Sequence, residues 1–283
     1  MTTALLFPGQ GSQAPGMRDA VERARPDLLE RATELCSADP FSCLELGTRY
    51  LQPALYCSSL ALWEEAGRPR GDLYAGHSLG EIAALVAAGS IDSVDGLWLA
   101  ARRGEVMQAA AEAQPEGSMI AVLGDDVVAR KLAAAHGLTV ANENAPGQTV
   151  LSGPTEAIKA ASAEAKARGA RAMRLAVKGA FHSPAMAPAA PRLRAALAEI
   201  VVREPAAPVI SGVTAKPIDD VRARLAEALV RPVRWREVLA ALRRLGAERF
   251  VEVGPGEVLT GLVRRTLPGA DALTLDELGA VHA

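Results

Sequence analysis

A serine flanked by glycines, in the pattern G-x-S-x-G at residues 76–80, constrains the fold of this chain more than any other feature. An apolar run precedes it at 73–75 and an amphipathic run follows it at 82–86, which predicts a strand, a sharp turn and a helix. In that context a serine becomes a nucleophile, because the turn exposes its hydroxyl and the first helical amides face any oxyanion formed there. The pattern alone also occurs by chance, so these flanks carry the interpretation. We therefore expect an α/β fold with a reactive Ser78.

Composition and charge argue against several classes of function. The chain has 283 residues, 49% of them hydrophobic but only 4% aromatic, which indicates helix-rich α/β packing with small side chains. The formal net charge of −2 gives no electrostatic case for nucleic acid, and no apolar run is long enough to predict a membrane span. Three cysteines without metal-ligand spacing and four histidines argue against a metal site. The chain begins with a strand rather than a cleavable apolar segment, so we expect a cytoplasmic protein with reduced thiols.

The first apolar run, residues 3–7, predicts a buried parallel strand that ends in the glycine-rich turn Pro8–Gln13. One interpretation of this turn is an ordinary loop between a strand and a helix. The other is a nest of backbone amides that faces a ligand at the carboxyl end of the strand. No Gly-Lys-Ser/Thr ending supports a nucleotide-binding loop.

Three helices are predicted around the elbow. Residues 26–36 carry apolar side chains along one side, and a second helix spans 52–65 with Pro53 in its first turn. Asp92 or Ser93 caps a third, long helix.

That long helix carries two adjacent arginines, Arg102 and Arg103. Helical spacing puts Arg103 on the same side as the apolar residues Leu99, Val106 and Met107. An arginine in this position either extends to solvent along its apolar stem or is buried opposite an anion. Helical periodicity alone does not decide cleanly which of the two arginines lies on the apolar side.

Between residues 118 and 178 the pattern changes to short strands and helices in the order β-α-β-β-α-β. The predicted strands are 119–123, 138–142, 148–152 and 171–177, and the predicted helices are 126–135 and 155–168. This order is typical of the split βαβ, or ferredoxin-like, arrangement. We therefore expect a small domain, 118–178, inserted into a large α/β domain formed by 1–117 and 179–283.

The chain returns to the large domain through a loop rich in Gly, Ser and Pro that carries His182. Loop imidazoles are available for chemistry, and His182 is better placed as a general base than His77 in the elbow, His136 at a helix end or His282 in the tail. The alternative is an ordinary loop histidine.

Two more buried strands are predicted at 208–213 and 250–253, and two helices at 232–245 and 258–267. The tail after Pro268 is uninformative about secondary structure.

Seven short motifs lie along the chain: Phe7–Gln13, Gln52–Ala54, Gly76–Glu81, Arg103–Gln108, Phe181–Ser183, Pro232–Trp235 and Glu252–Gly256. In this order they resemble the motifs of the malonyl-CoA:acyl carrier protein transacylases, and they are also similar to those of free-standing polyketide synthase acyltransferases. One such motif is weakly specific, whereas all of them in order are highly specific.

The resemblance implies an α/β-hydrolase-like large domain with a parallel sheet and an inserted ferredoxin-like small domain. It also implies a ping-pong reaction in fatty acid or polyketide biosynthesis. Malonyl moves from malonyl-CoA to Ser78 and then to the 4′-phosphopantetheine thiol of an acyl carrier protein. Carried over from the family, Ser78 is the nucleophile and His182 its general base. The backbone amides of Gln10 and Leu79 form the oxyanion hole, and Arg103 binds the malonyl carboxylate.

Further roles follow from the same resemblance. Phe181 would line the acyl pocket, and the backbone carbonyl of Ala228 would orient His182 in place of an acidic side chain. The family motif places its arginine directly before a glycine, which selects Arg103 over Arg102. We expect no bound cofactor or metal, and a monomer whose partner is the carrier protein.

The sequence departs from the family pattern in three places. The segment between Cys36 and Gln52 is shorter than in typical members, and Leu51 stands before Gln52 where threonine is common. Phe181 precedes His182 as in malonyl-selecting polyketide acyltransferases, whereas fatty-acid transacylases often have serine. This last difference leaves the pathway open but not the type of reaction.

Three alternatives stay open. A thioesterase or proofreading hydrolase would use water as the second acceptor on the same fold. Transferase subunits of malonate decarboxylase are also similar, but their elbow usually lacks the Leu79 and Glu81 found here. A non-catalytic carrier-docking module would form no covalent adduct on Ser78.

Carrier proteins are acidic, so docking on this nearly neutral chain needs a local basic surface. Lys159 and Lys166 share one face of a predicted helix, and Arg174 and Lys178 share the outward parity of the following strand. The alternative is an ordinary solvated charged face.

Overall fold

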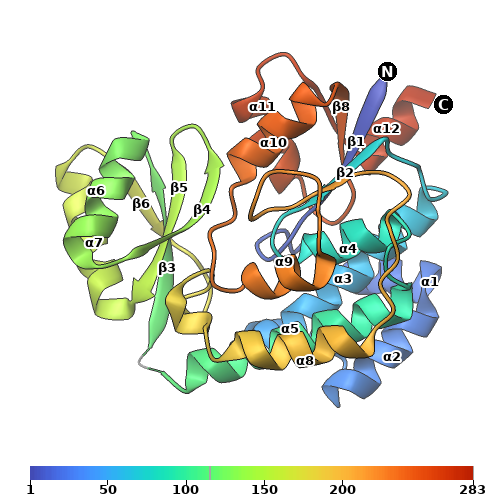
Figure 1. Ribbon diagram of the computed structural model, residues 1–283, viewed down its shortest axis with the longest axis horizontal. Helices are drawn as coiled ribbons and strands as arrows, with labels where there is room; N and C mark the ends of the chain where they lie inside the picture. Colours follow the sequence, from blue (N-terminus) through green and yellow to red (C-terminus); the bar gives the residue numbers. More distant parts are fainter. Residues whose placement is uncertain (115, 283) are drawn as a thin grey trace.

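The computed structural model describes residues 1–114 and 116–282. Its larger part is built on a parallel sheet of five strands in the order β7-β2-β1-β8-β9 (Figure 1). Every neighbouring pair in that sheet is parallel. In chain order the strands are β1 (Thr2–Phe7), β2 (Leu73–Gly76), β7 (Val209–Ile210), β8 (Ala247–Glu252) and β9 (Asp271–Thr274).

Helices cover both faces of this sheet. Leu5 and Phe7 of β1 pack into one apolar cluster, whereas Ala4 and Leu6 pack into another on the opposite face. A strand buried on both faces reads as a continuous apolar run, which explains the pattern seen at residues 3–7. The expectation of an α/β fold with a parallel sheet is therefore confirmed.

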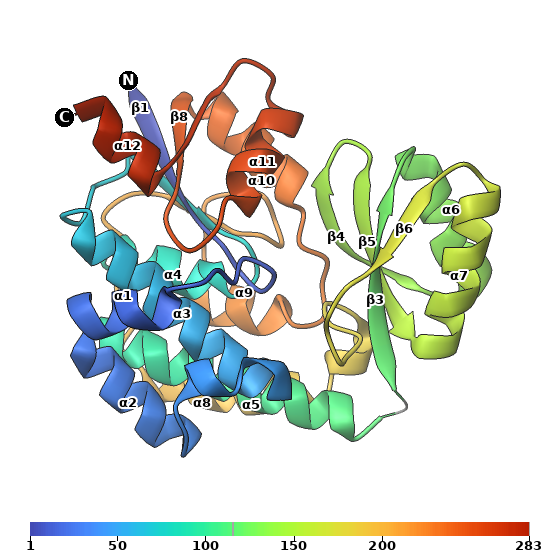
Figure 2. The same cartoon turned by 180° about the vertical axis from the view of Figure 1, so that it is seen from behind.

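One face carries most of the helices, and Figure 2 shows α10 and α11 on the other side of the sheet. The first set comprises α1 (Met17–Ala24), α2 (Pro26–Cys36), α3 (Thr48–Glu65), α4 (Gly80–Ala87), α5 (Ser93–Glu112), α8 (Ala189–Glu199), α9 (Val221–Glu227) and α12 (Leu275–His282). The second comprises α10 (Trp235–Arg244) and α11 (Val258–Thr266). Three short 3-10 helices complete the described elements: η1 (Pro40–Ser42), η2 (Leu44–Leu46) and η3 (Pro184–Met186).

A separate antiparallel sheet of four strands, in the order β4-β5-β3-β6, forms the green and yellow unit of Figure 1. Its elements are β3 (Gly117–Leu123), α6 (Asp126–His136), β4 (Thr139–Ala145), β5 (Gln148–Pro154), α7 (Thr155–Ala167) and β6 (Arg171–Arg174). Its two helices pack on the sheet through an apolar cluster of their own, built around Leu132, Leu151 and Ile158.

Val233, in the segment just before α10, pairs with β4 of the small sheet. Its amide donates to the carbonyl of Ala141 at 2.9 Å, and its carbonyl accepts from the amide of Glu143 at the same distance. A salt bridge of 2.6 Å between Arg236 and Asp126 lies beside this connection. The small sheet is therefore fixed to the larger part of the structure at the start of α10.

Two predicted helix starts were wrong. Helix α3 begins at Thr48 rather than at residue 52, with Pro53 inside it. The proline removes one amide donor, and the carbonyl of Arg49, one turn earlier, instead faces the Cys36 thiol at 3.9 Å. Helix α10 begins at Trp235 rather than at residue 232, because Val233 is extended against β4.

The tail after Pro268, for which no element was predicted, contributes the edge strand β9 and the helix α12. Within the described ranges, no helix has the length and apolar composition needed to cross a membrane.

Candidate active site

The G-x-S-x-G pattern forms a tight turn between β2 and α4. Ser78 has a positive φ of 55°, which places its hydroxyl at the tip of the turn. A Cβ atom on Gly76 would come within 2.0 Å of the Gly80 backbone, and one on Gly80 within 2.0 Å of the Phe7 carbonyl oxygen. Only glycine fits at both positions, so the sequence pattern is a packing requirement of the elbow.

Ser78, His182 and Ala228 form a hydrogen-bonded line. The Ser78 Oγ lies 2.8 Å from His182 Nε2, and His182 Nδ1 lies 2.8 Å from the Ala228 carbonyl oxygen. Because a carbonyl only accepts, Nδ1 carries the proton and Nε2 is free to accept from the serine hydroxyl. Burial, aided by the charge of Arg103, lowers the pKa of His182 to about 3, so the imidazole is neutral at physiological pH.

Arg103 of α5 points inward and is only 3% exposed. Its Nη1 donates to Gln52 Oε1 at 2.8 Å, and its Nη2 donates to Ser78 Oγ at 3.1 Å. Burial lowers its pKa to about 10, and no carboxylate of the described residues lies within ion-pair distance of it. The site therefore holds a buried cation beside the serine, and an anionic group of a ligand could pair with it.

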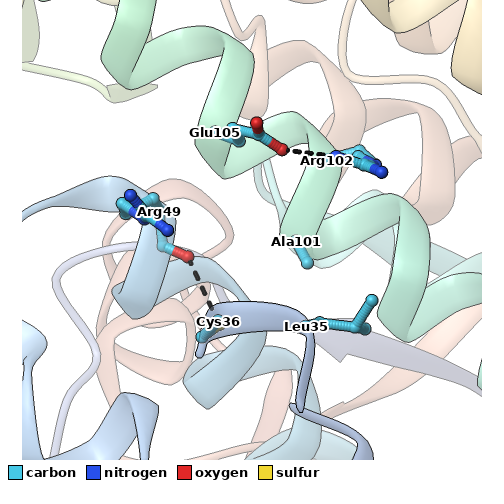
Figure 3. A pocket seen from close by; sticks show the side chains of 6 residues that line it. All are labelled: Leu35, Cys36, Arg49, Ala101, Arg102 and Glu105. Carbon is cyan, nitrogen blue, oxygen red and sulfur yellow. Dashed lines mark hydrogen bonds and ion pairs between the residues drawn. The ribbon is translucent and has the colours of Figure 1, made fainter. Parts of the chain in front are cut away.

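Arg102, the adjacent arginine, lies on the outer side of α5. It forms a 2.8 Å salt bridge with Glu105 and rests over the Trp98 ring. Figure 3 shows this pair in a small surface pocket, together with the contact between Cys36 and the Arg49 carbonyl. The structure thus separates the two arginines that periodicity left unresolved.

The Pro8–Gln13 loop lies directly against the elbow. A Cβ atom on Gly9 would come within 2.4 Å of the His77 carbonyl oxygen and 3.6 Å of the Leu79 amide nitrogen. Gln10 and Leu79 line the same pocket, and among the described residues neither backbone amide donates a hydrogen bond. This arrangement leaves two amide donors beside Ser78.

The pocket above Ser78 is also lined by Phe181, which is buried. It adjoins a second groove, between α3 and α5 on one side and the segment 174–181 on the other. Gln10, Leu175, Val177 and Phe181 line both. A ligand arm could therefore reach the serine along this groove.

Several residues at the site were not predicted to contribute to it. His77 Nε2 lies 2.9 Å from Asn144 Oδ1 of β4, and its ring packs edge-on against Trp235. Burial lowers the pKa of His77. This histidine ties the elbow to the small sheet. The contact joins residues far apart in sequence, and no local pattern signals it.

Glu81, in the first turn of α4, is a buried carboxyl close to the elbow. Burial raises its pKa to about 7, against the opposing effects of the Gly212 amide, the charge of Arg103 and the Ser211 hydroxyl. Its Oε1 atom has no hydrogen-bond partner among the described residues. Glu81 is therefore a buried carboxyl near the elbow whose pKa lies close to neutral pH.

The four basic residues considered for docking divide into two places. Arg174 and Lys178 are exposed and line the groove that leads to Ser78. Lys159 and Lys166 are exposed on α7, where Lys159 pairs with Glu156 at 2.7 Å. Within the described ranges, no cluster of three or more His, Cys, Asp or Glu side chains could hold a metal ion.

Comparison with known proteins gives a consistent result. The acyl transferase domain family matches residues 35–280. The malonyl CoA-acyl carrier protein transacylase of Escherichia coli K12 is 39% identical over 99% of this chain and 97% of that protein. The polyketide biosynthesis protein ThaF of Burkholderia thailandensis is 41% identical over 94% of this chain, which spans 24% of its length. A solved complex of a type II polyketide synthase acyl-carrier protein with its malonyl-transacylase matches with a TM-score of 0.84 and 36% identity, over 97% of this chain and 94% of that one.

Proposed function

The chain belongs to the acyl transferase family, and we propose that it transfers a malonyl group from coenzyme A to the phosphopantetheine thiol of an acyl carrier protein. The relatives named as malonyl transacylases over nearly their whole length support this proposal. The observation that carries it is the buried guanidinium of Arg103, 3.1 Å from Ser78 Oγ and without a carboxylate partner among the described residues. Malonyl supplies that carboxylate. The pathway is fatty acid or polyketide biosynthesis.

In the first half-reaction, Ser78 Oγ attacks the thioester carbonyl while His182 Nε2 accepts the hydroxyl proton. The amides of Gln10 and Leu79 donate to the oxygen that becomes negative in the tetrahedral intermediate. Collapse of this intermediate breaks the carbon–sulfur bond, and His182 returns the proton to the departing coenzyme A thiolate. The product is a malonyl ester on Ser78.

The second half-reaction runs the same chemistry with the carrier thiol as nucleophile. His182 takes the thiol proton, the sulfur attacks the ester carbonyl, and the proton passes to Ser78 Oγ as the ester bond breaks. The Ala228 carbonyl keeps the histidine in the required tautomer throughout. No acidic side chain is needed for this step.

The two-domain organisation is part of the proposal. We infer an α/β-hydrolase-like domain formed by 1–117 and 179–283 and a ferredoxin-like domain formed by 118–178, acting as a monomer without a bound cofactor. The antiparallel strand order and the separate apolar cluster of the small sheet support this division. The phosphopantetheine arm would enter along the groove between α3 and α5 and the segment 174–181.

The basic side chains at that groove support docking of an acidic carrier. Arg174 and Lys178 stand at its edge, close enough to guide an approaching phosphopantetheine. Lys159 and Lys166 lie on α7 away from the groove lining, so they would contact the body of the carrier instead.

Intact-mass measurement tests the proposal directly. Incubation with malonyl-CoA should add one malonyl group to the wild-type protein and none to the Ser78→Ala variant, because the elbow tolerates a smaller side chain. Addition of a carrier protein bearing phosphopantetheine should then discharge the adduct onto the carrier. Discharge at the same rate in buffer alone would indicate a hydrolase, and the absence of any adduct would indicate a docking module.

A further inference from the structure

Thr48, the first residue of α3, lies in the interior beside the active site although it has no role in the proposed reaction. Its side chain is buried, at 5% exposure. Its hydroxyl donates to Gln10 Oε1 at 3.2 Å and accepts from Gln52 Nε2 at 2.8 Å. Thr48 therefore connects the Pro8–Gln13 loop to α3.

The connection continues to the serine. Gln52 Oε1 accepts from Arg103 Nη1 at 2.8 Å, and Arg103 Nη2 donates to Ser78 Oγ at 3.1 Å. One chain of hydrogen bonds thus runs from the loop that supplies the Gln10 amide, through Thr48 and Gln52, to the guanidinium beside Ser78.

Arg103 sets the direction of every bond in this chain. A guanidinium only donates, so the Gln52 side chain must turn its oxygen towards Arg103 and its NH₂ group towards Thr48. The Thr48 hydroxyl then accepts from Gln52 and has its own proton left to donate to Gln10. A hydroxyl is needed at position 48, because it must accept on one side and donate on the other.

Close packing between α3 and α5 holds Thr48 in place. A Cβ atom on Gly104 would come within 2.6 Å of the Thr48 carbonyl oxygen, so only glycine lets the helices approach there. Gln108 Oε1 accepts from the Arg49 amide at 3.1 Å and so caps the start of α3. A side chain locked by such packing can transmit orientation to its neighbours.

We propose that Thr48 is a positioning residue that couples the orientation of Arg103 to that of the Gln10 loop, and so links carboxylate recognition to oxyanion stabilisation. The proposal rests on the proposed malonyl transfer. Loss of the hydroxyl leaves Gln52 Nε2 with only its 3.3 Å contact to Met107 Sδ. The Gln52 oxygen that accepts from Arg103 is then held less firmly, so the guanidinium is less well oriented. A malonyl group needs that orientation, whereas an acetyl group has no carboxylate and does not.

The test compares acylation rates of Thr48→Val and Thr48→Ser with malonyl-CoA and acetyl-CoA, measured by intact mass. Valine keeps the volume but removes the hydroxyl, whereas serine keeps the hydroxyl. Thr48→Val should lower the malonyl rate constant about 10-fold and the acetyl rate constant about threefold or less, because only the Gln10 end of the chain affects both. Thr48→Ser should keep the wild-type ratio of the two. If the ratio of the malonyl to the acetyl rate constant in Thr48→Val equalled that of wild type, the proposal would be overturned, even if both rate constants fell.

Two further measurements keep this test decisive. In an Arg103→Ala background, adding Thr48→Val should leave the malonyl-to-acetyl ratio unchanged, because the coupling needs both residues. A further fall of that ratio would refute the coupling. If Thr48→Val fails to fold, Thr48→Ala replaces it. The malonyl-to-acetyl ratio should again fall, and an unchanged ratio would again overturn the proposal. Wild-type protein that forms no malonyl adduct would contradict the proposed function rather than the role of Thr48.

Discussion

Replacement of Arg103 by alanine tests the recognition of the substrate carboxylate most directly. Arg103 is 3% exposed, and its guanidinium is held by Gln52 and donates to Ser78. Charge-assisted hydrogen bonds in such a partly dehydrated pocket contribute about 2–4 kcal/mol. Arg103→Ala should therefore lower kcat/KM for malonyl-CoA by about 30- to 1,000-fold.

Acetyl-CoA provides the internal comparison, because its acyl group has no carboxylate to leave unpaired. The assay is a competition between malonyl-CoA and acetyl-CoA for Ser78, with the two adducts resolved by mass. Arg103→Ala should spare or improve the acetyl reaction while the malonyl reaction falls.

Arg102→Ala is a matched control, since it removes the same side chain from the next position of the same helix. Arg102 is exposed and paired with Glu105, so its loss should leave both rates within about twofold of wild type. If Arg103→Ala instead lowered the malonyl and acetyl rates equally, Arg103 would be structural and carboxylate recognition would have to lie elsewhere.

Two other residues give independent predictions. Phe181→Ser should relax the exclusion of methylmalonyl-CoA, because the buried ring crowds the pocket. The variant should lose about 1–3 kcal/mol of discrimination against methylmalonyl-CoA. An unchanged ratio of methylmalonyl to malonyl transfer in a competition assay would contradict this prediction. The pKa of Glu81 is raised to about 7 in the native state, from an ordinary value of 4.5. Between these two pH values the native state keeps a proton that the unfolded state has released. The free energy of unfolding should therefore fall as pH rises from about 4.5 to 7. Glu81→Gln should remove that loss, so the variant should gain on the order of 3 kcal/mol of stability relative to wild type between about pH 4 and pH 8. Denaturant titrations showing no pH-dependent difference between the two proteins would refute it.

The pH dependence of wild-type stability also contains an opposing contribution from His182. Its pKa is lowered to about 3, so its neutral form favours the native state, and this stability is lost as pH falls below the ordinary value of 6.5. The difference between wild type and Glu81→Gln cancels this contribution, which is why the comparison rather than the single curve isolates the carboxyl.

Local patterns were sufficient to predict the elbow and most elements around it. The G-x-S-x-G pattern corresponds to real close approaches at Gly76 and Gly80, and Asp92 accepts from the Val94 amide as a helix cap. The unbroken apolar run of β1 correctly indicated a strand covered on both faces. These features depend on contacts close in sequence or on burial alone.

What the sequence did not predict depends on long-range contacts. Pro53 suggested the first turn of a helix, but the true start at Thr48 is set by Gln108 of α5, which caps it. The edge strand β9 is stabilised by pairing with β8 rather than by its own composition. The contact between His77 and Asn144 joins two sheets, so neither residue is marked by its neighbours in the chain.

The charges at the site explain why acetyl transfer should survive, or even improve, without Arg103. Burial is the main cause of the low pKa of His182, and the charge of Arg103 is the next. In the free protein the base is therefore weaker than an ordinary imidazole, although it is neutral. Under the proposed function, a malonyl carboxylate paired with Arg103 would offset that charge and so strengthen the base only when malonyl is bound. Acetyl-CoA brings no such charge, whereas Arg103→Ala removes the opposing cation for every substrate. The same arginine would thus favour malonyl twice, once by pairing with its carboxylate and once through the histidine.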